Sequence, residues 1–189
     1  MAKERVALFG GSFNPPHVGH LLAISYVLGV GEVDRVVAVP VFEHALGKQL
    51  VPFEHRVEMA RLAFGWLPRV EVSAIEASLG APSRTLSTIV ALEALHPDWA
   101  LRLMVGSDIL DELHQWHAFQ EIEQRAPPLV LQRTIEGRST PASSLLPAVS
   151  STEVRELLAR RRQGELVDAR LEALVPRAAL DYARAHDLY

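Results

Sequence analysis

Short apolar runs alternate with segments of helical spacing from residue 6 to residue 132. The apolar runs have the length and composition of buried strands, and they cover residues 6–9, 33–39, 70–74, 100–105 and 129–132. Helical segments are expected between them over residues 21–28, 53–64, 85–95 and, as one broken helix or two short ones, 108–125. This alternation predicts an α/β fold with a parallel sheet, helices on both of its faces and right-handed crossovers.

The rest of the chain is expected to be a C-terminal helical segment. Residues 138–147 are rich in Ser, Thr and Pro, which indicates a surface loop, and helices are expected over 151–162 and 177–186. Because too little chain follows this loop to fold alone, residues 1–189 are predicted to form one domain. In the helix expected over 85–95, the apolar residues should face the core: Leu86, Ile89, Val90 and Leu92.

Composition narrows the functional classes. The 189 residues are 49% hydrophobic, and they carry a formal net charge of -4 with a pI near 6.1. A net acidic chain argues against a general nucleic-acid binder, because such proteins usually show a basic footprint. The lack of cysteine excludes disulfides, thiolate zinc sites and cysteine nucleophiles. No apolar run approaches the length needed to cross a bilayer, so we expect a cytoplasmic protein without a nucleic-acid or membrane partner. The oligomeric state stays open.

The stretch GGSFNPPHVGHL at residues 10–21 is the first candidate for chemistry. It lies between the first predicted strand and the first helix, where backbone N–H groups at a helix start can bind phosphate. His17 and His20 are three residues apart, so both imidazoles should lie on one face of that helix. The alternative is a tight strand-to-helix connection whose histidines are solvated or cap the helix, and the combined string disfavours it.

The string VSSTEVR at residues 149–155 is the second candidate. Ser150, Ser151 and Thr152 are good N-cap residues, and Arg155 lies one turn into the helix. Hydroxyls, free N–H groups and a guanidinium would then face one point and attract a phosphate. Taken alone, the string is explained at least as well by a well-capped surface helix. Its pairing with the first string gives it weight.

Together the two strings resemble the signatures of the nucleotidylyltransferase superfamily. The first is similar to its (T/S)-x-x-H-x-G-H region and the second to its I-S-S-T-x-x-R signature. Within that superfamily, three segments resemble the bacterial nicotinate-mononucleotide adenylyltransferases: HRVEMARLA at 55–63, GSDILDELHQW at 106–116 and VPRAALDYARAHDLY at 175–189. The last of these is not expected in the related phosphopantetheine adenylyltransferases. The resemblance covers nearly the whole chain and implies a Rossmann-like sheet.

The resemblance implies that the phosphate of nicotinate mononucleotide attacks the α-phosphorus of ATP, forming deamido-NAD and pyrophosphate in NAD biosynthesis. Such chemistry depends on alignment and on charge neutralisation, so it needs no protein nucleophile. The implied catalytic residues are His17, His20 and Arg155. Mg²⁺ is expected to be carried mainly by the substrate phosphates, with no protein ligand named. The ATP-binding residues are those three with Gly10, Gly11, Ser12, Phe13, Gly106, Asp108, Ser150, Ser151 and Thr152.

The residues implied in binding the pyridine mononucleotide are Asn14, Lys48, Arg84, Thr85 and Trp116. Trp116 stands where the family places a tryptophan that stacks on the pyridine ring, although an isolated tryptophan is more often a core residue. Trp66 and Trp99 are assigned to the core. Lys48 either reaches the phosphates or is solvated, because its loop lacks the prolines of the family. Arg56 either contacts the site or pairs with a neighbouring Glu.

Three positions depart from the family pattern. Asn14 stands where nicotinate enzymes usually have Asp, and it adds a donor beside the phosphates, as in the related nicotinamide-mononucleotide enzymes. Ser107 replaces Ala, which is a small change. Arg84 replaces Tyr, and its guanidinium either pairs with the pyridine carboxylate or points to solvent. The alternatives are therefore adenylyl transfer to nicotinamide mononucleotide or phosphopantetheine, or a nucleotide-binding module without turnover, which the two intact signatures disfavour.

Overall fold

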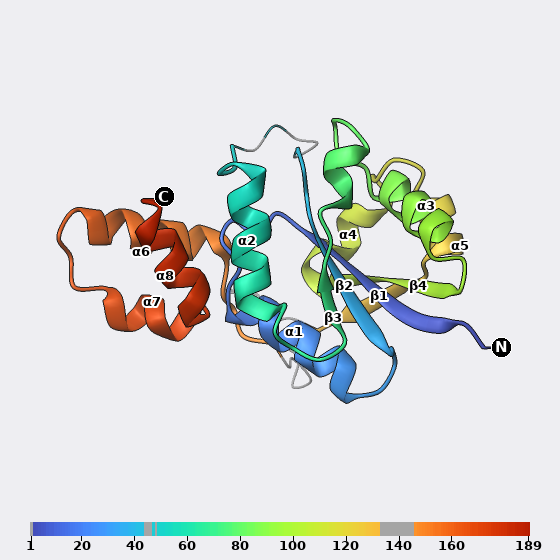
Figure 1. Ribbon diagram of the computed structural model, residues 1–189, viewed down its shortest axis with the longest axis horizontal. Helices are drawn as coiled ribbons and strands as arrows, with labels where there is room; N and C mark the ends of the chain where they lie inside the picture. The colour runs from blue at the N-terminus through green and yellow to red at the C-terminus, as the bar shows by residue number, and fades with distance from the viewer. Residues whose placement is uncertain (1, 44–46, 48, 133–145) are drawn as a thin grey trace.

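A five-stranded sheet forms the centre of the protein, and all of its strand pairs are parallel (Figure 1). The computed structural model describes residues 2–43, 47, 49–132 and 146–189. The strands are β1 (Glu4–Gly11), β2 (Arg35–Pro40), β3 (Val70–Val72), β4 (Trp99–Gly106) and β5 (Pro128–Leu131). Each overlaps an apolar run predicted from the sequence, because strands of a parallel sheet covered on both faces need near-continuous apolar stretches.

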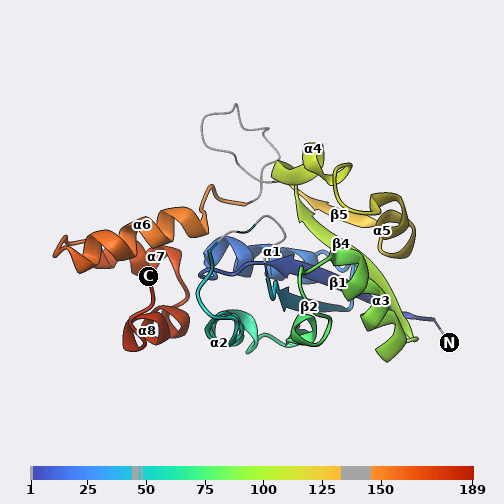
Figure 2. The ribbon, with the colours of Figure 1, turned by 90° about the horizontal axis from the view of Figure 1, so that it is seen from above.

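Helices cover both faces of the sheet (Figure 2). Within the first 132 residues they are α1 (Val18–Gly29), α2 (Phe53–Phe64), α3 (Thr85–Leu95), α4 (Leu110–Leu113) and α5 (Phe119–Arg125), with 3₁₀ turns η1 (Ile75–Ser78) and η2 (Ser107–Ile109). The later helices are α6 (Ser151–Arg162), α7 (Asp168–Leu174) and α8 (Arg177–Ala185). These three lie together at one end of the molecule, beside α2 (Figure 1). The predicted α/β fold with a C-terminal helical segment is confirmed.

The sheet separates two apolar clusters. In β1, Ala7 belongs to the cluster that contains buried residues of α1 and α2, whereas Val6 and Leu8 belong to the one that contains α3, α4 and α5. This alternation follows from the pleat, which sends successive side chains to opposite faces. Residues of α6, α7 and α8, such as Leu157 and Leu171, extend the first cluster. The C-terminal helices are thereby packed into the same core as α1 and α2.

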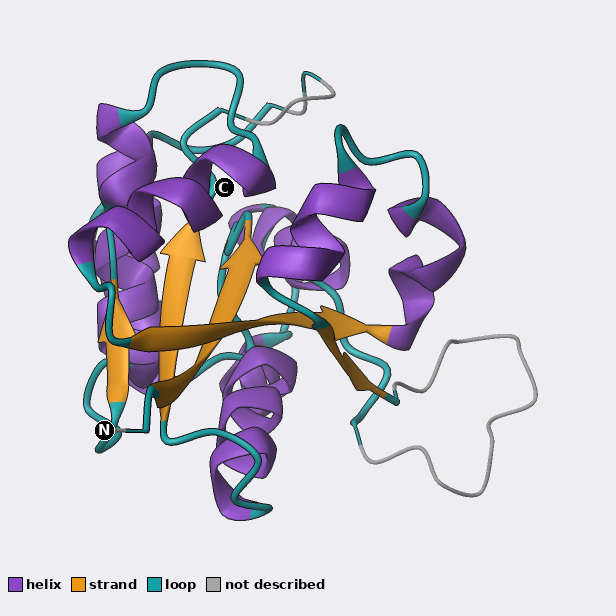
Figure 3. Cartoon of the chain, turned by 90° about the vertical axis from the view of Figure 1, so that its right-hand side faces the viewer, coloured by secondary structure: helices purple, strands orange, loops and turns teal. Residues whose placement is uncertain are grey.

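The strand order β3-β2-β1-β4-β5 fixes where a ligand can bind. The sequence order of the strands changes direction between β1 and β4, which are neighbours in the sheet. In open α/β sheets, ligands bind outside the carboxyl ends of the strands at such a point. Residues 10–12 close β1 and residues 106–108 close β4, so both predicted loops meet there. Figure 3 shows the strand arrowheads of the sheet and the helices around them.

Some side chains differ from the sequence prediction. Ile89 and Leu92 are buried and Leu86 is half-buried, but Val90 is 43% exposed on α3, so its assignment to the core was wrong. Trp99 is buried as predicted, whereas Trp66 is 66% exposed just beyond α2, and its indole N–H donates to the carbonyl of Ala63. Across residues 2–43, 47, 49–132 and 146–189, none of the helices combines the length and the apolarity needed to cross a bilayer.

Candidate active site

The turn after β1 is held by side chains packed beneath it. Phe13 has a φ of 45°, in the left-handed region, and its ring is fully buried. This ring makes edge contacts with Phe9 and Phe64 at centroid distances of 5.5 and 5.4 Å. Such packing can hold a backbone conformation that a non-glycine residue rarely adopts. Phe13, which the sequence assigned to ATP contacts, therefore offers its backbone, and not its ring, to a ligand.

His17 and His20 lie together at the start of α1, as their spacing predicts. Their rings stack with centroids 3.7 Å apart, and His17 is the N-cap residue and only 3% exposed. The backbone N–H of His17 donates to Nδ1 of His20 across 3.1 Å. A neutral imidazole that accepts at Nδ1 carries its proton on Nε2. The half-buried His20 ring is thereby set with Nε2 as its donor nitrogen.

Gly19, between the two histidines, is where the two sequence strings meet. A methyl group on its α-carbon would lie 2.8 Å from Cγ1 of Val149 and 3.0 Å from two atoms of the His17 ring. Both neighbours are buried, so neither has room to withdraw. The glycine therefore lets both Val149 and the His17 ring pack closely against the start of α1.

The second string joins the first through hydrogen bonds at the start of α6. Ser150 caps the helix as predicted, since its hydroxyl accepts from the N–H of Glu153. Ser151 donates its hydroxyl to the carbonyl of Pro15 across 2.8 Å. Arg155 donates one guanidinium nitrogen to the carbonyl of Asn14 across 2.8 Å and the other to the hydroxyl of Thr152 across 3.1 Å. The helix is thus more than a capped surface helix, because its first turn is bonded to the histidine turn.

A cavity of about 460 Å³ lies between the two strings. It is lined by Ser12, Asn14, Gln49, Leu50, Ser151, Thr152 and Arg155. Hydroxyl groups, a guanidinium and the start of a twelve-residue helix border one space, which is the environment an anionic phosphate chain prefers.

Hydrogen bonds from the buried Arg56 side chain fix the backbone of the loops around this cavity. It is 1% exposed, and its guanidinium donates to the carbonyls of four residues in two loops: Ser12 in the turn after β1, and Val41, Phe42 and Val51 in the loop between β2 and α2. Burial lowers its pKa, but an arginine keeps its charge at any physiological pH. Pairing with a neighbouring Glu was the wrong interpretation: Arg56 ties the turn after β1 to both ends of the loop between β2 and α2.

The loop after β4 brings a carboxylate to the same edge of the sheet. Asp108 lies exposed in η2, and a methyl group on Gly106 would meet its Oδ1 at a distance too short for any contact. The carboxylate therefore folds back over the Gly106 backbone. Within the residues that the structure describes, no group of three or more His, Asp or Glu side chains could hold a metal ion.

The predicted acceptor residues are divided between the two faces of the sheet. Arg84 is the exposed N-cap of α3, Thr85 begins that helix, and Trp116 is half-buried against the cluster of α3, α4 and α5. All three lie on the opposite face from α1 and its histidines. Asn14 is on the histidine side, only 3% exposed, with its carboxamide oxygen bonded inside the protein. Lys48 lies outside the described residues.

A buried carboxylate ties the α3 side to the rest of the edge. Glu76 is 6% exposed, and it accepts from the N–H of Phe42 and from the hydroxyl of Thr88 in α3, both across 2.9 Å. The Ser83 hydroxyl accepts from the same Phe42 N–H and from that of Glu43. The loop after β2 therefore connects Arg56 on one side to the start of α3 on the other.

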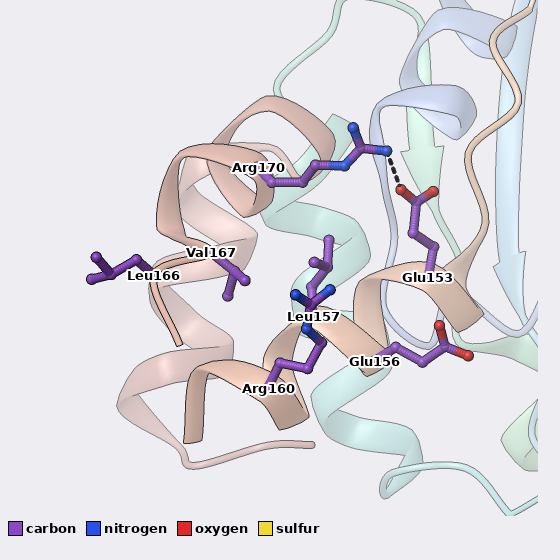
Figure 4. Close-up of a pocket in the computed structure, with 7 residues that line it drawn as sticks. All are labelled: Glu153, Glu156, Leu157, Arg160, Leu166, Val167 and Arg170. Atoms are coloured by element: carbon purple, nitrogen blue, oxygen red, sulfur yellow. Dashed lines mark hydrogen bonds and ion pairs between the residues drawn. The ribbon is translucent and has the colours of Figure 1, made fainter. Parts of the chain in front are cut away.

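A second hollow, between α6 and α7, differs in character (Figure 4). It measures about 360 Å³ and shares no lining residue with the cavity between the strings. Its two guanidiniums are already paired, Arg170 with Glu153 across 2.6 Å and Arg160 with Glu165 across 2.7 Å. Cations neutralised in this way make a poor phosphate site, so the cavity between the strings is the candidate active site.

Comparison with known proteins identifies the family to which the chain belongs. The cytidylyltransferase-like family model matches residues 8–157, a span that contains both strings. A relative in Myxococcus xanthus named "Probable nicotinate-nucleotide adenylyltransferase" is 44% identical, over 98% of this chain and 94% of its own. The chain belongs to the nicotinate-nucleotide adenylyltransferase family. A relative of the same name in Anaeromyxobacter dehalogenans is also 44% identical, over 98% of this chain and 97% of its own.

Solved structures of this activity share the fold. Nicotinic acid mononucleotide adenylyltransferase of Plasmodium falciparum, complexed with NaAD, matches with a TM-score of 0.78 at 16% identity, over 98% of this chain and 97% of that one. The same enzyme complexed with APC matches with a TM-score of 0.77. At such low identity these matches establish the Rossmann-like architecture, which the sequence resemblance had implied.

Two features of the site were missed by sequence reasoning. The bonds of Arg56 go to backbone carbonyls, which have no sequence signal. The hydroxyl of Tyr189 donates to the carboxamide oxygen of Asn14 across 2.8 Å, and the two residues are 175 positions apart. The tail segment that ends in Tyr189 resembles the family, and this resemblance is the one sequence signal that points to the Tyr189 contact.

Proposed function

We propose that the protein transfers the adenylyl group of ATP to nicotinate mononucleotide. The phosphate oxygen of the mononucleotide bonds to the α-phosphorus of ATP, the bond from that phosphorus to the bridging oxygen breaks, and pyrophosphate leaves with deamido-NAD as the other product. The observation that carries the proposal is the cavity bordered by both signature strings, at the point where the strand order changes direction, in a chain of this family.

The ATP triphosphate occupies the cavity between the strings. His20 donates from Nε2 to a phosphate oxygen that gains charge in the transition state, and the stacked His17 ring holds it in place. Ser151, Thr152 and Arg155 contact the β- and γ-phosphates at the start of α6. Donors fixed before the reaction stabilise developing charge without having to reorganise. Removal of one such donor typically raises the activation free energy by about 3 kcal/mol.

Magnesium belongs on the substrate in this proposal. Imidazoles and guanidiniums are poor ligands for a hard cation, and Asp108 is the carboxylate at the carboxyl end of β4. This donor set fits an ion held mainly by phosphate oxygens, with Asp108 beside it or on the ribose. When bound, the ion neutralises charge on the leaving pyrophosphate.

The acceptor enters from the α3 side of the sheet edge. There Trp116 stacks on the pyridine ring, Thr85 lies at the start of α3, and Arg84 pairs with the pyridine carboxylate. The buried bonds of Glu76 hold the loop after β2 against this side, so the two substrate halves meet over β1 and β4.

The test offers three acceptors with ATP and Mg²⁺: nicotinate mononucleotide, nicotinamide mononucleotide and phosphopantetheine. Pyrophosphate release is measured for each, with an acceptor-free reaction to correct for ATP hydrolysis. We expect kcat/KM to be highest with nicotinate mononucleotide, with deamido-NAD as product. A higher kcat/KM with another acceptor would show that this acceptor, and not nicotinate mononucleotide, is the substrate. ATP binding without pyrophosphate release with any acceptor would show that the protein is a nucleotide-binding module without turnover.

A further inference from the structure

The side chain of Tyr189 reaches back from beyond α8 to the turn after β1. Its hydroxyl lies 2.8 Å from the carboxamide oxygen of Asn14, and its ring packs on the cluster that contains α1 and α2. Residue 189 therefore touches the first signature string, although Tyr189 lies outside both strings and belongs to no predicted contact.

The direction of the hydrogen bond is set by the neighbours of Asn14. The carboxamide oxygen also accepts from the N–H of Val51 across 3.3 Å, and a backbone N–H can only donate. The atom that receives both bonds is therefore the oxygen, and the Tyr189 hydroxyl must be the donor. Burial raises the pKa of Tyr189, against the opposing charges of Arg56 and Arg155, so the hydroxyl keeps its proton.

Asn14 carries this contact to the phosphate-binding side of the site. Its side-chain oxygen accepts hydrogen bonds from Tyr189 and Val51, and its backbone carbonyl accepts one from the guanidinium of Arg155 across 2.8 Å. Asn14 is only 3% exposed, and its bonds join Tyr189 and Arg155 in one hydrogen-bond network, in which the loss of one bond can change the strength of the others.

We propose that Tyr189 is a positioning residue for adenylyl transfer: its hydroxyl fixes Asn14, and the Asn14 carbonyl in turn orients Arg155 toward the phosphates of ATP. This inference rests on the proposed function for its kinetic consequence. The competing explanation is that Tyr189 only packs α8 and the tail onto the core, a role for which its ring suffices without the hydroxyl.

The experiment compares the full-length protein with Tyr189→Phe, which keeps the ring and removes the hydroxyl. The matched control is Tyr182→Phe, because Tyr182 also lies in the tail segment and its hydroxyl bonds Nδ1 of His55 across 2.9 Å, away from the signature strings. Loss of one buried hydrogen bond predicts a five- to tenfold fall, on the order of 1 kcal/mol, in the affinity for Mg-ATP and in kcat/KM for Tyr189→Phe alone.

The deciding measurement repeats Tyr189→Phe in an Arg155→Ala background and reads the Kd of Mg-ATP, which needs no turnover. If Tyr189 acts through Arg155, the loss shrinks to less than about twofold there, since coupled residues are not additive. An equal loss in both backgrounds, or a lowered Tm with unchanged Kd, would overturn the inference. An inactive wild type that binds Mg-ATP would contradict the proposed function instead, and the Kd comparison would still decide the role of Tyr189.

Discussion

Replacing Gly19 by Ala tests whether the two signature strings are packed against each other. The new methyl group would lie 2.8 Å from Cγ1 of Val149 and 3.0 Å from Cε1 and Nδ1 of His17. The first distance is well below ordinary carbon contact, which begins near 3.5 Å. Because Val149 and His17 are both 3% exposed, relief requires α6 to move relative to α1. The substitution therefore strains the packing between α1 and the start of α6, which border the cavity.

The expected cost follows from two opposing effects. Overfilling a packed site costs about 1–3 kcal/mol in the free energy of unfolding. Alanine is a better helix former than glycine by at most about 1 kcal/mol, and Gly19 is the second residue of α1. We expect Gly19→Ala to destabilise the protein by about 1–2 kcal/mol. Shortening Val149 to Ala removes Cγ1, the atom in closest contact, at its own cost of about 1.6 kcal/mol for two methyl groups.

The assay is urea unfolding of the wild type, both single variants and the double variant, analysed with a common m-value. If the packing is as described, adding Gly19→Ala to Val149→Ala costs less than about 0.5 kcal/mol, which gives a coupling above about 0.5 and up to about 2 kcal/mol. Additivity within about 0.5 kcal/mol would refute the reasoning, since it would mean that Gly19 and Val149 are not in contact.

Three further outcomes are expected. Arg56→Lys, which cannot reach four carbonyls in two loops at once, lowers the free energy of unfolding by about 2–3 kcal/mol through lost buried hydrogen bonds, and an unchanged urea midpoint would contradict this. Hydrogen bonds from Arg5 lower the pKa of Asp34 to about 2, so the stability lost in Asp34→Asn is present above pH 4 and fades as pH falls toward 2; a difference that grows in acid would be inconsistent with the pair. Nicotinate mononucleotide quenches the fluorescence of the wild type but not of Trp116→Phe, and equal quenching would remove Trp116 from the acceptor site.

The strands and most helices could be predicted because their signal is local. A strand buried on both faces needs a run of apolar residues, and Val36 to Val39 in β2 show it plainly. Helix α7 was missed although Val167, Leu171 and Leu174 have helical spacing and pack on the first apolar cluster, because a helix of seven residues is too short for a periodic pattern to stand out. Trp66 was placed in the core by residue type, yet it lies one residue beyond the cap of α2, where the chain turns outward.

The parts of the site that form local sequence motifs could be predicted, whereas the contacts between residues distant in the sequence could not. The stacking of His17 on His20 follows from a spacing of three, and the cap at Ser150 follows from its residue type. The bonds of Arg56 to carbonyls and of Tyr189 to Asn14 depend on how distant loops meet, which no local pattern encodes. The same limit applies to Asn14: the sequence predicts a donor beside the phosphates, and Asn14 does line the cavity, but no pattern predicts that its oxygen accepts from Val51 and Tyr189.

In the proposed reaction, the two strings form one site where His20 stabilises charge on ATP during adenylyl transfer. This role of His20 is tested most directly by kcat for pyrophosphate release from ATP and nicotinate mononucleotide in His20→Ala. The matched control is His96→Ala, whose ring stacks on Trp99 at the amino end of β4. We predict a fall in kcat of about a hundredfold or more for His20→Ala and a near-normal value for His96→Ala. Near-normal turnover in His20→Ala would contradict the account.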